Sequence, residues 1–388
     1  MSTTRRDFIR TSVAAGGAMA LGVGTPDEVE ALQPGLSSHC SSMCGEGPQS
    51  RSLRILILGG TSLLGPHQVH ESLARGHQVT IFTRGRTQPS VHPEDFQRVE
   101  HLMGDRAVPD YEALKGREWD VILDNSTSQW EWARDAAQLL KDAAGTYAFV
   151  SSTGVYWPYF TTGIDESLQP RTVDESNGEN GSAAYGVMKT LGEIEVQKAF
   201  GDRALVVRPQ HFTGPGERAN RHGYWVQRMD RGGEVLAMGK PTDRVMLLDV
   251  RDLAEFMLNL AESRTGGVFN VAGPASTLTM EEFLHGLRFC TGAPVTWSWV
   301  DDYEFLQDQD LTYVVPWTMP AGTELGYTSI NIDKALAHGL KHRPLAQTHF
   351  DFREWWYSDA VPQERRRNAR FPLTPEREAE ILAAWRAR

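Results

Sequence analysis

The stretch LRILILGGTSLLG, residues 53–65, decides the fold of this chain. Its first half is an apolar run broken by one charge, Arg54, which is typical of a buried parallel strand. Residues 66–75 carry apolar side chains one helical turn apart and end at Gly76, a natural helix stop. The glycine loop therefore lies between a strand and a helix, where backbone N–H groups and the helix dipole bind a pyrophosphate. A tight turn without a ligand is the alternative.

The second predicted strand, residues 77–86, ends in two arginines. At this position an acidic residue suits the ribose 2′-hydroxyl of NAD, whereas an arginine suits the 2′-phosphate of NADP. Arg84, with or without Arg86, therefore favours NADP(H), with NAD(H) as the alternative cofactor. Arg84 stacked on the adenine or left in solvent is the other interpretation, since arginine stacks well on flat rings.

An acid–base pair follows further along the chain. A strand-like run at residues 147–150 ends in Ser151 and Ser152, and Tyr185 precedes Lys189 by four residues. Residues four apart are neighbours on a helix surface, so the ammonium favours the phenolate. Lowering a tyrosine pKa from about 10 to about 7 takes roughly 4 kcal/mol. Tyr185 is then a general acid or base near neutral pH, unless the pair stands by chance on a solvated helix.

The glycine loop, the Ser-Ser strand end and the Tyr-x-x-x-Lys motif, in this order, resemble the short-chain dehydrogenase/reductase superfamily. The similarity is to its extended branch of epimerases, dehydratases and reductases acting on sugars, and it covers most of residues 53–275. The resemblance implies an α/β fold with a doubly wound parallel sheet (Rossmann fold) at residues 53–275, containing a substrate-lobe insertion near 212–245. Residues 276–388 are then a smaller α/β substrate lobe with a terminal helix.

The resemblance also implies the site residues. Ser152, Tyr185 and Lys189 correspond to the catalytic set, with Ser151 as the alternative to Ser152. The family spacing GxxGxxG asks for glycine where this chain has Ser62, a small residue that can donate its hydroxyl to a phosphate. The predicted cofactor-binding residues are Gly59, Thr61, Ser62, Leu63, Leu64, Gly65, Arg84, Asp105, Asn125, Ser151, Lys189, Pro209 and His211.

Three of these assignments have plainer alternatives. Asp105 resembles the family residue that contacts the adenine amino group, and Asn125 follows the fourth predicted strand, but both residue types also favour ordinary turns. Pro209 ends the strand predicted at residues 204–209 and His211 follows it; in the extended family this strand end lies beside the nicotinamide. A lone histidine in a loop proves little, so His211 more simply lines the pocket or caps a turn.

Composition sets limits on the function. The chain has 388 residues, 40% of them hydrophobic, and a net charge of −11 with a pI near 5.6. This balance argues against a surface for nucleic-acid phosphates and fits small polar substrates better. Cys40, Cys44 and His39 lack the second ligand pair usual for a metal, so we predict a disulfide or no role for these cysteines and no metal site.

The amino terminus resembles a twin-arginine export signal. Thr4 to Arg10 contains Arg5-Arg6 and precedes a mildly apolar, alanine- and glycine-rich stretch. We therefore expect a signal at residues 1–25, recognised by the twin-arginine export machinery, and a flexible linker at 26–52. The protein is then periplasmic or extracellular, with no stable membrane span. A disordered basic tail with a chance arginine pair is the alternative.

Export bears on the reaction. Little free nicotinamide cofactor is expected outside the cytoplasm, so the cofactor must stay bound and be regenerated within one cycle, as in epimerisation of a sugar-like alcohol. Dehydration is disfavoured, because the family pattern has Asp-Glu where this chain has Thr153-Gly154. The rivals are a simple NADP-dependent carbonyl reductase and a non-catalytic dinucleotide-binding sensor or interaction protein, like the chloroplast RNA-binding relatives. Family enzymes often dimerise through two helices, which suggests a homodimer.

The last third of the chain contributes the substrate lobe. Arg251 either contacts an anionic or sugar substrate or pairs with Asp249 or Asp252. Thr279 has the sequence context of a helix N-cap. A terminal helix is expected from Thr374, its cap, to the C-terminus, residue 388.

Overall fold

The computed structural model describes residues 51–126, 128–175 and 180–388. The predicted export signal and most of the predicted linker, with Cys40 and Cys44, lie outside the described residues. Within the described ranges no helix is long and apolar enough to cross a membrane.

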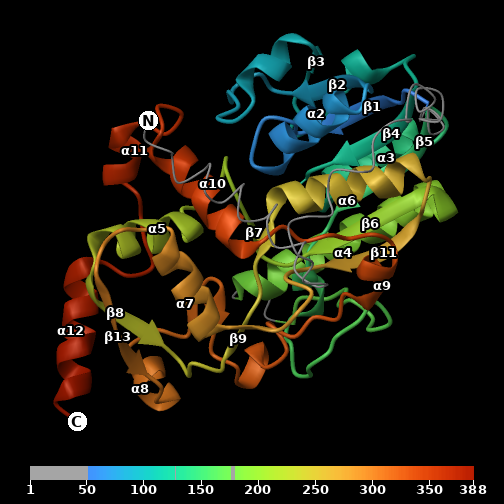
Figure 1. Cartoon of the computed structure of the whole chain (residues 1–388). Coiled ribbons are helices and arrows are strands. Elements are labelled where there is room, and N and C mark those ends of the chain that lie inside the picture. The colour runs from blue at the N-terminus through green and yellow to red at the C-terminus, as the bar shows by residue number, and fades with distance from the viewer. Residues whose placement is uncertain (1–50, 127, 176–179) are drawn as a thin grey trace, which may run out of the picture. The chain divides into compact units, whose positions relative to one another are not determined.

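A seven-stranded sheet organises the described chain, and every neighbouring pair of its strands is parallel (Figure 1). The strand order is β11-β6-β5-β4-β1-β2-β3. The strands are β1 Arg54–Leu58, β2 Gln78–Thr83, β3 Glu100–Met103, β4 Trp119–Asp124, β5 Ala144–Val150, β6 Ala204–Pro209 and β11 Gly267–Val271. The chain runs outward from β1 to β3 and then returns to β4, so the order reverses beside β1. The predicted doubly wound Rossmann sheet is confirmed, and ligands bind such sheets at this reversal, outside the strands' carboxyl ends.

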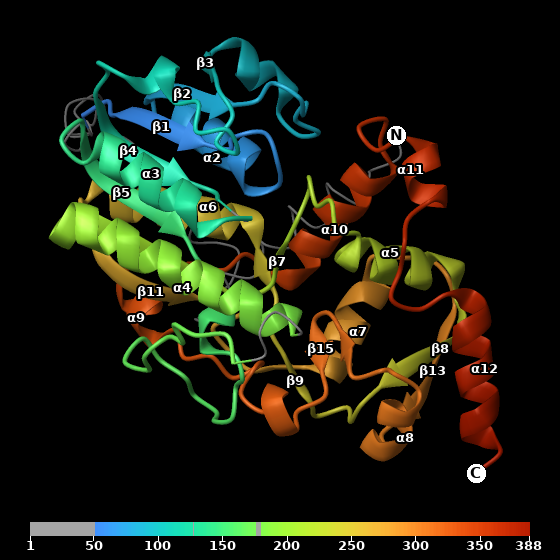
Figure 2. The ribbon, with the colours of Figure 1, turned by 180° about the vertical axis from the view of Figure 1, so that it is seen from behind.

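Helices cover both faces of the sheet. On one face α2 (Leu64–Ala74) packs against α6 (Val250–Glu262), and on the other α3 (Trp130–Leu140) packs against α4 (Gly181–Phe200), as Figures 1 and 2 show from opposite sides. Strand β1 contributes to the hydrophobic cores on both faces of the sheet. Ile55 and Ile57 belong to the core under α2 and α6, and Leu56 and Leu58 belong to the core under α3 and α4. A strand buried on both faces reads as an unbroken apolar run, which is why residues 53–58 lack alternation.

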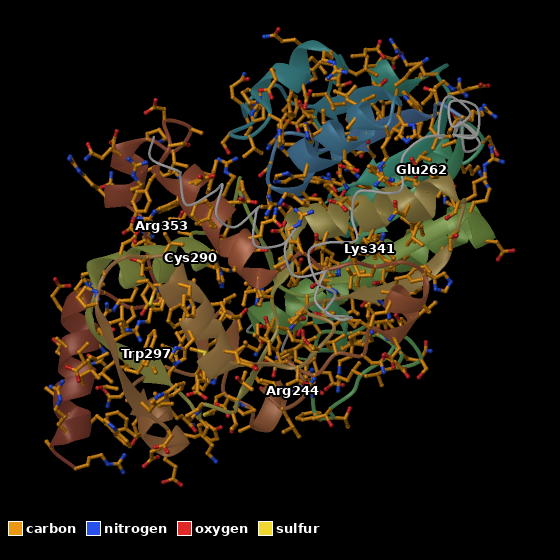
Figure 3. All side chains as sticks on the ribbon, in the orientation of Figure 1. Arg244, Glu262, Cys290, Trp297, Lys341 and Arg353 are labelled. Carbon is orange, nitrogen blue, oxygen red and sulfur yellow. The ribbon has the colours of Figure 1, made fainter. Side chains whose placement is uncertain are left out.

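Ion pairs at the end of α6 hold the first helix pair together. Glu262 is labelled in Figure 3. Arg75 Nη1 donates to Glu262 Oε2 at 2.9 Å, and His77 Nε2 lies 2.9 Å from the other oxygen of this carboxylate. The C-terminal ends of α2 and α6 are thereby connected to each other and to the residue before β2.

A separate, smaller core lies in the part of the chain predicted to be the substrate lobe. Its centre is the parallel pair β8 (Gly233–Met238) and β13 (Val295–Val300). Around these strands lie α5 Arg221–Arg231, α7 Met280–Phe289, α8 Tyr303–Asp308 and α12 Pro375–Arg386, whereas α10 Leu345–Tyr357 packs on α5 and α7 and is followed by α11 Gln363–Arg367. Residues 327–340 return to the main core, where α9 (Asp333–Ala337) packs against β11.

Short elements complete the chain. Two-residue strands are β7 Phe212–Thr213, β9 Arg244–Val245, β10 Leu248–Asp249, β12 Leu278–Thr279, β14 Tyr313–Val314 and β15 Trp317–Thr318, and the 3₁₀ helices are η1 Pro93–Gln97, η2 Glu112–Leu114, η3 Thr153–Tyr156, η4 Gly201–Arg203 and η5 Gly322–Glu324. Both predicted helix starts in the lobe are confirmed: Thr279 and Glu282 form a capping box, and Thr374 accepts from Arg377 N at the start of α12.

Candidate active site

The glycine loop folds tightly against the start of α2. Gly59 has φ +85°, a conformation that side chains disfavour. A Cβ on Gly65 would lie 2.4 Å from the carbonyl carbon of Gly60, so only glycine lets the helix begin this close to the loop. Within the described part of the chain, no side chain caps the start of α2, whose N-cap residue is Leu63. The amide groups and dipole of this helix end fit a phosphate group, and its binding there stays a prediction.

A pocket of about 260 Å³ lies at this helix start. Of the predicted loop residues, Thr61, Ser62 and Leu63 line it, whereas Leu64 and Gly65 are buried in the helix. The remaining lining residues are Pro66, Arg86, Thr87, Gln88, Ser90, Gly216, Arg218 and Arg365. The pocket therefore joins the glycine loop to the end of β2 and to two arginines from outside the nucleotide-binding half.

The residues predicted to bind the adenosine half have mixed surroundings. Arg84 is exposed at the end of β2. Asp105 accepts from Ala107 N at 3.0 Å, the ordinary turn contact, and lies 3.6 Å from Arg86. Asn125 donates to Gln68 Oε1 at 2.7 Å, but its own Oδ1 is buried without a hydrogen-bond partner among the described residues. An unpaired buried acceptor is costly unless a ligand satisfies it.

The two serines after β5 have different environments. Ser151 donates to Glu193 of α4, and Glu193 in turn binds Arg208 of β6 at 2.6 and 2.9 Å, so Ser151 belongs to a buried structural network. Ser152 caps η3 by accepting from Gly154 N at 3.0 Å and also hydrogen-bonds with Tyr185. The surroundings thus favour Ser152 over Ser151 as the residue that meets a substrate oxygen.

Glycine also places the acid–base pair. Tyr185 and Lys189 both lie on α4, with Gly186 between them. A Cβ on Gly186 would lie 2.3 Å from the carbonyl oxygen of Gly154, so the helix touches the turn after Ser152 at this point. Lys189 Nζ lies 5.9 Å from the centre of the Tyr185 ring. The helix therefore brings all three predicted catalytic residues together.

Burial is the largest influence on the pKa values of the pair. Burial raises the pKa of Tyr185, while the Ser152 hydrogen bond and the charge of Arg221 oppose this rise. Lys189 donates to the carbonyl oxygens of Ser126 and of Val150, the latter at 2.8 Å, so its charge is held by the backbone. Burial lowers the pKa of Lys189 to about 8, against the pull of nearby carboxylates. In the protein alone the pKa of Tyr185 is therefore raised, and its lowering by Lys189 together with an oxidised nicotinamide stays a prediction.

A cavity of about 1010 Å³ opens in front of these residues. Ser151, Ser152, Tyr185, Pro209 and His211 line its sheet side. Facing groups come from the other half of the chain, namely Glu217, Arg221, Tyr313, Glu324 and Tyr327. A space of this size with aromatic and polar walls accommodates a small polar ligand.

His211 lines this cavity as a neutral group. Its Nε2 contacts the Tyr313 hydroxyl and its Nδ1 lies 3.2 Å from Arg221 Nη1. Burial and the Arg221 charge lower the pKa of His211 to about 3. Because arginine only donates hydrogen bonds, Nδ1 accepts and the ring proton sits on Nε2. The interpretation of His211 as a pocket-lining residue is confirmed in its position.

Sequence reasoning missed several groups at these pockets. Burial raises the pKa of Glu217 to about 7, and Tyr313 and Tyr327 hydrogen-bond each other at 3.1 Å on the cavity wall. Arg365 reaches the smaller pocket from α11. For Arg365 the sequence signal is the basic run at residues 365–367, which does not indicate the part of the fold that this run contacts.

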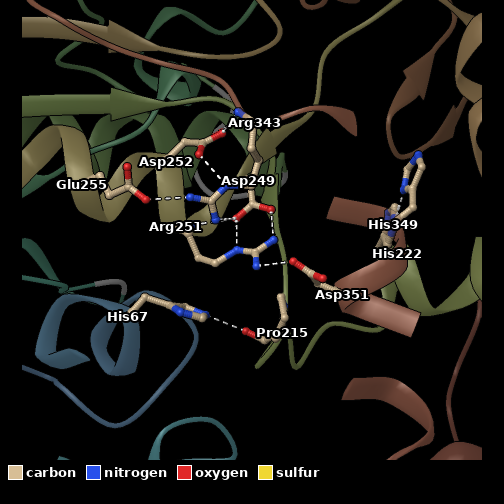
Figure 4. A network of polar contacts seen from close by, with 10 residues as sticks. All are labelled: His67, Pro215, His222, Asp249, Arg251, Asp252, Glu255, Arg343, His349 and Asp351. Carbon is tan, nitrogen blue, oxygen red and sulfur yellow. Dashed lines mark hydrogen bonds and ion pairs between the residues drawn. The ribbon is translucent and has the colours of Figure 1, made fainter. Parts of the chain in front are cut away.

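Arg251 pairs with carboxylates. Its guanidinium binds Asp249 at 2.7 and 2.9 Å and Asp351 of α10 at 2.5 Å (Figure 4). Arg343 joins the same network through Asp249 and Asp252. Of the alternatives for Arg251, pairing with Asp249 is therefore confirmed, and the residue links α6 to α10.

Comparisons with known proteins agree with this architecture. The sequence profile of the NAD dependent epimerase/dehydratase family matches residues 55–272. The chain is 26% identical over 240 residues to the chloroplast stem-loop binding protein of 41 kDa b from Arabidopsis thaliana, a match that spans 58% of this chain and 60% of that protein's length. It is 26% identical over 282 residues to 2′-dehydrokanamycin reductase from Streptomyces kanamyceticus, covering 67% and 76% of the two chains.

Solved structures share the fold. UDP-glucuronic acid 4-epimerase from Bacillus cereus, solved with NAD, superposes with a TM-score of 0.59 at 15% identity, covering 80% of this chain and 99% of that one. At this level of identity the likeness concerns the fold alone.

Proposed function

This chain belongs to the NAD dependent epimerase/dehydratase family, and on that premise we propose that it is an oxidoreductase or epimerase acting on a sugar-like alcohol. The observation that carries the proposal is that Ser152 and Tyr185 meet at the wall of the large cavity, with Lys189 buried 5.9 Å from the centre of the Tyr185 ring. A sensor has no need of this set. The uncapped start of α2 and the unpaired Asn125 Oδ1 fit a dinucleotide beside it.

In the proposed mechanism each residue has one task. A bound nicotinamide dinucleotide supplies the hydride acceptor or donor for the substrate carbon. Tyr185 takes or returns the proton of the substrate oxygen, and Ser152 hydrogen-bonds to the same oxygen. Lys189, fixed by two backbone carbonyls, keeps a positive charge under the site and orients the ribose.

Cofactor choice and export belong to the proposal as well. Exposed Arg84, with Arg86, supports NADP as the preferred cofactor over NAD. We further propose that residues 1–25 direct the folded protein out of the cytoplasm and that its cofactor remains bound and is recycled. Protein purified after export, denatured and analysed by mass spectrometry should release close to one NADP per chain. Turnover that consumes added NADP stoichiometrically contradicts recycling.

Replacing Tyr185 by phenylalanine tests the catalytic assignment. The change removes the acid–base group, so turnover should fall roughly 10²- to 10⁴-fold while dinucleotide affinity stays the same. Turnover is followed by nicotinamide absorbance and product chromatography on a panel of free sugars, glycosides and nucleotide sugars. Tyr357→Phe is the matched control, because Tyr357 lies on α10 outside the cavity. Equal activity of Tyr185→Phe and wild type contradicts the mechanism.

Binding of structured RNA is the second candidate, suggested by the name of the Arabidopsis relative. The net charge of −11 opposes it, because affinity for nucleic acid comes largely from contacts between cations and phosphates. A gel-shift assay with a stem-loop RNA at physiological salt decides this point. A stable complex there would favour the RNA-binding function over the enzyme.

A further inference from the structure

Cationic side chains converge on the pocket at the start of α2. Opposite Ser62 of the glycine loop, the pocket is lined by Arg86, Arg218 and Arg365. They come from three separate places in the chain: the end of β2, the segment before α5, and α11 near the C-terminus. The C-terminal segment thus forms one wall of a pocket whose other wall is the glycine loop.

Among the described residues, two of these three arginines form no ion pair. Arg86 lies 3.6 Å from Asp105. Within the described ranges, no carboxylate forms an ion pair with Arg218 or Arg365. Burial and the neighbouring charge of Arg218 lower the pKa of Arg365, and Glu217 only partly opposes them. Like charges gathered at a helix amino terminus make a site for an anion.

The Arg365 guanidinium is held in position before any ligand binds. Its Nη2 donates to the Glu217 carbonyl oxygen at 2.5 Å and to Asn220 Oδ1 at 3.3 Å. Its Cζ lies 5.4 Å from the centre of the Trp355 ring. Trp355 Nε1 in turn donates to the Ser90 carbonyl oxygen at 3.2 Å, which anchors α10 to the loop after β2. A fixed guanidinium loses little conformational entropy when it binds phosphate oxygens.

We propose that Arg218 and Arg365 bind the diphosphate of the dinucleotide and close its pocket from the C-terminal side. The inference rests on the proposed function and adds to it a device that retains the cofactor. A guanidinium matches the paired oxygens of a phosphate. The diphosphate is common to NAD and NADP, so the two arginines act on both cofactors alike, and discrimination is left to Arg84 and Arg86.

Isothermal titration of the full-length protein with NAD, NADP and ADP-ribose tests the inference. Arg218→Gln and Arg365→Gln should each lower the affinity for all three ligands roughly tenfold to a hundredfold, since each variant loses a charge-assisted hydrogen bond. Stopped-flow fluorescence should show most of this change in the dissociation rate. Arg367→Gln is the matched control, because it removes the same charge from the same short helix outside the pocket.

The outcomes separate the inference from the proposed function. If the wild type binds the ligands and Arg218→Gln and Arg365→Gln bind them equally well, the inference that these arginines hold the diphosphate is wrong. The proposed enzyme function is not affected by this result. A lower affinity for NADP alone also contradicts the inference, because the arginines then contact the 2′-phosphate and not the diphosphate. A wild type that binds none of the three ligands overturns both proposals. If Arg365→Gln shows no thermal unfolding transition, that variant does not fold. The test then rests on Arg218→Gln, because Arg218 is exposed and its replacement should leave the fold unchanged.

Discussion

Lys189 is a buried cation held by the backbone. Two carbonyl oxygens accept from its Nζ, and the Phe149 ring centre lies 5.1 Å away. In the protein alone, the groups that lower the pKa of Tyr185 are Ser152 beside it and Arg221 of α5. The pKa of Tyr185 therefore depends on the turn after β5 and on α5, which both lie outside its own helix.

Glu217 gives a pH-dependent prediction at the same scale. Burial raises the pKa of this carboxyl from the usual 4.5 to about 7 in the folded state. Between these values the folded protein keeps a proton that the unfolded chain has released, so the unfolding free energy contributed by Glu217 falls as pH rises. The loss reaches roughly 3 kcal/mol above pH 7.

Urea unfolding of wild type and Glu217→Gln at several pH values measures this effect. Glutamine keeps an acceptor for His222 N, which Glu217 Oε2 binds at 3.1 Å, but it does not titrate. The stability of wild type relative to Glu217→Gln should fall between about pH 5 and pH 8. Parallel curves across this window would show that the carboxyl titrates at its ordinary value.

At the scale of elements, the junction between β1 and α2 depends on Gly65. Gly65→Ala places a methyl group where the Gly60 backbone lies. We expect a cost of about 1–3 kcal/mol in unfolding free energy and weaker dinucleotide binding, because the loop must move. Thermal unfolding and titration with NAD measure both. Gly292→Ala is the control, since a Cβ there meets nothing within 4 Å.

Local patterns predicted the elements well because their causes are local. The apolar run at residues 53–58, the stop at Gly76 and the caps at Thr279 and Thr374 each act within a few residues, and the structure contains the corresponding strand and helices. The approach of Arg365 to the glycine loop has no local cause. It depends on how α10 packs against the loop after β2, through a small core that contains Val91, Trp355 and Trp356. No periodicity in the sequence encodes such a contact.

At the scale of the whole molecule, Arg343 joins the segment before α10 to α6. It binds Asp249 and Asp252, which are 1% and 5% exposed, and also Glu255. Arg343→Met leaves these carboxylates short of a partner, so unfolding should become easier by about 3 kcal/mol. Arg117→Met, which breaks an exposed pair with Glu100, is the control and should cost under about 1 kcal/mol. The free energy of unfolding of both variants is measured in urea. Similar decreases in the two variants would contradict the stabilising role of the Arg343 ion pairs.

The clamp residue comes late in the chain. Strand β11 completes the seven-stranded sheet at Val271. Arg365 follows near the C-terminus, and so does Glu378 of α12, which binds Arg228 and Arg231 of α5. During translation the sheet and the glycine loop therefore leave the ribosome while the wall that closes their pocket is still unmade. We expect the cofactor to enter an open site first and to be enclosed when the last residues emerge, an order that ribosome-bound chains stalled at successive lengths would reveal.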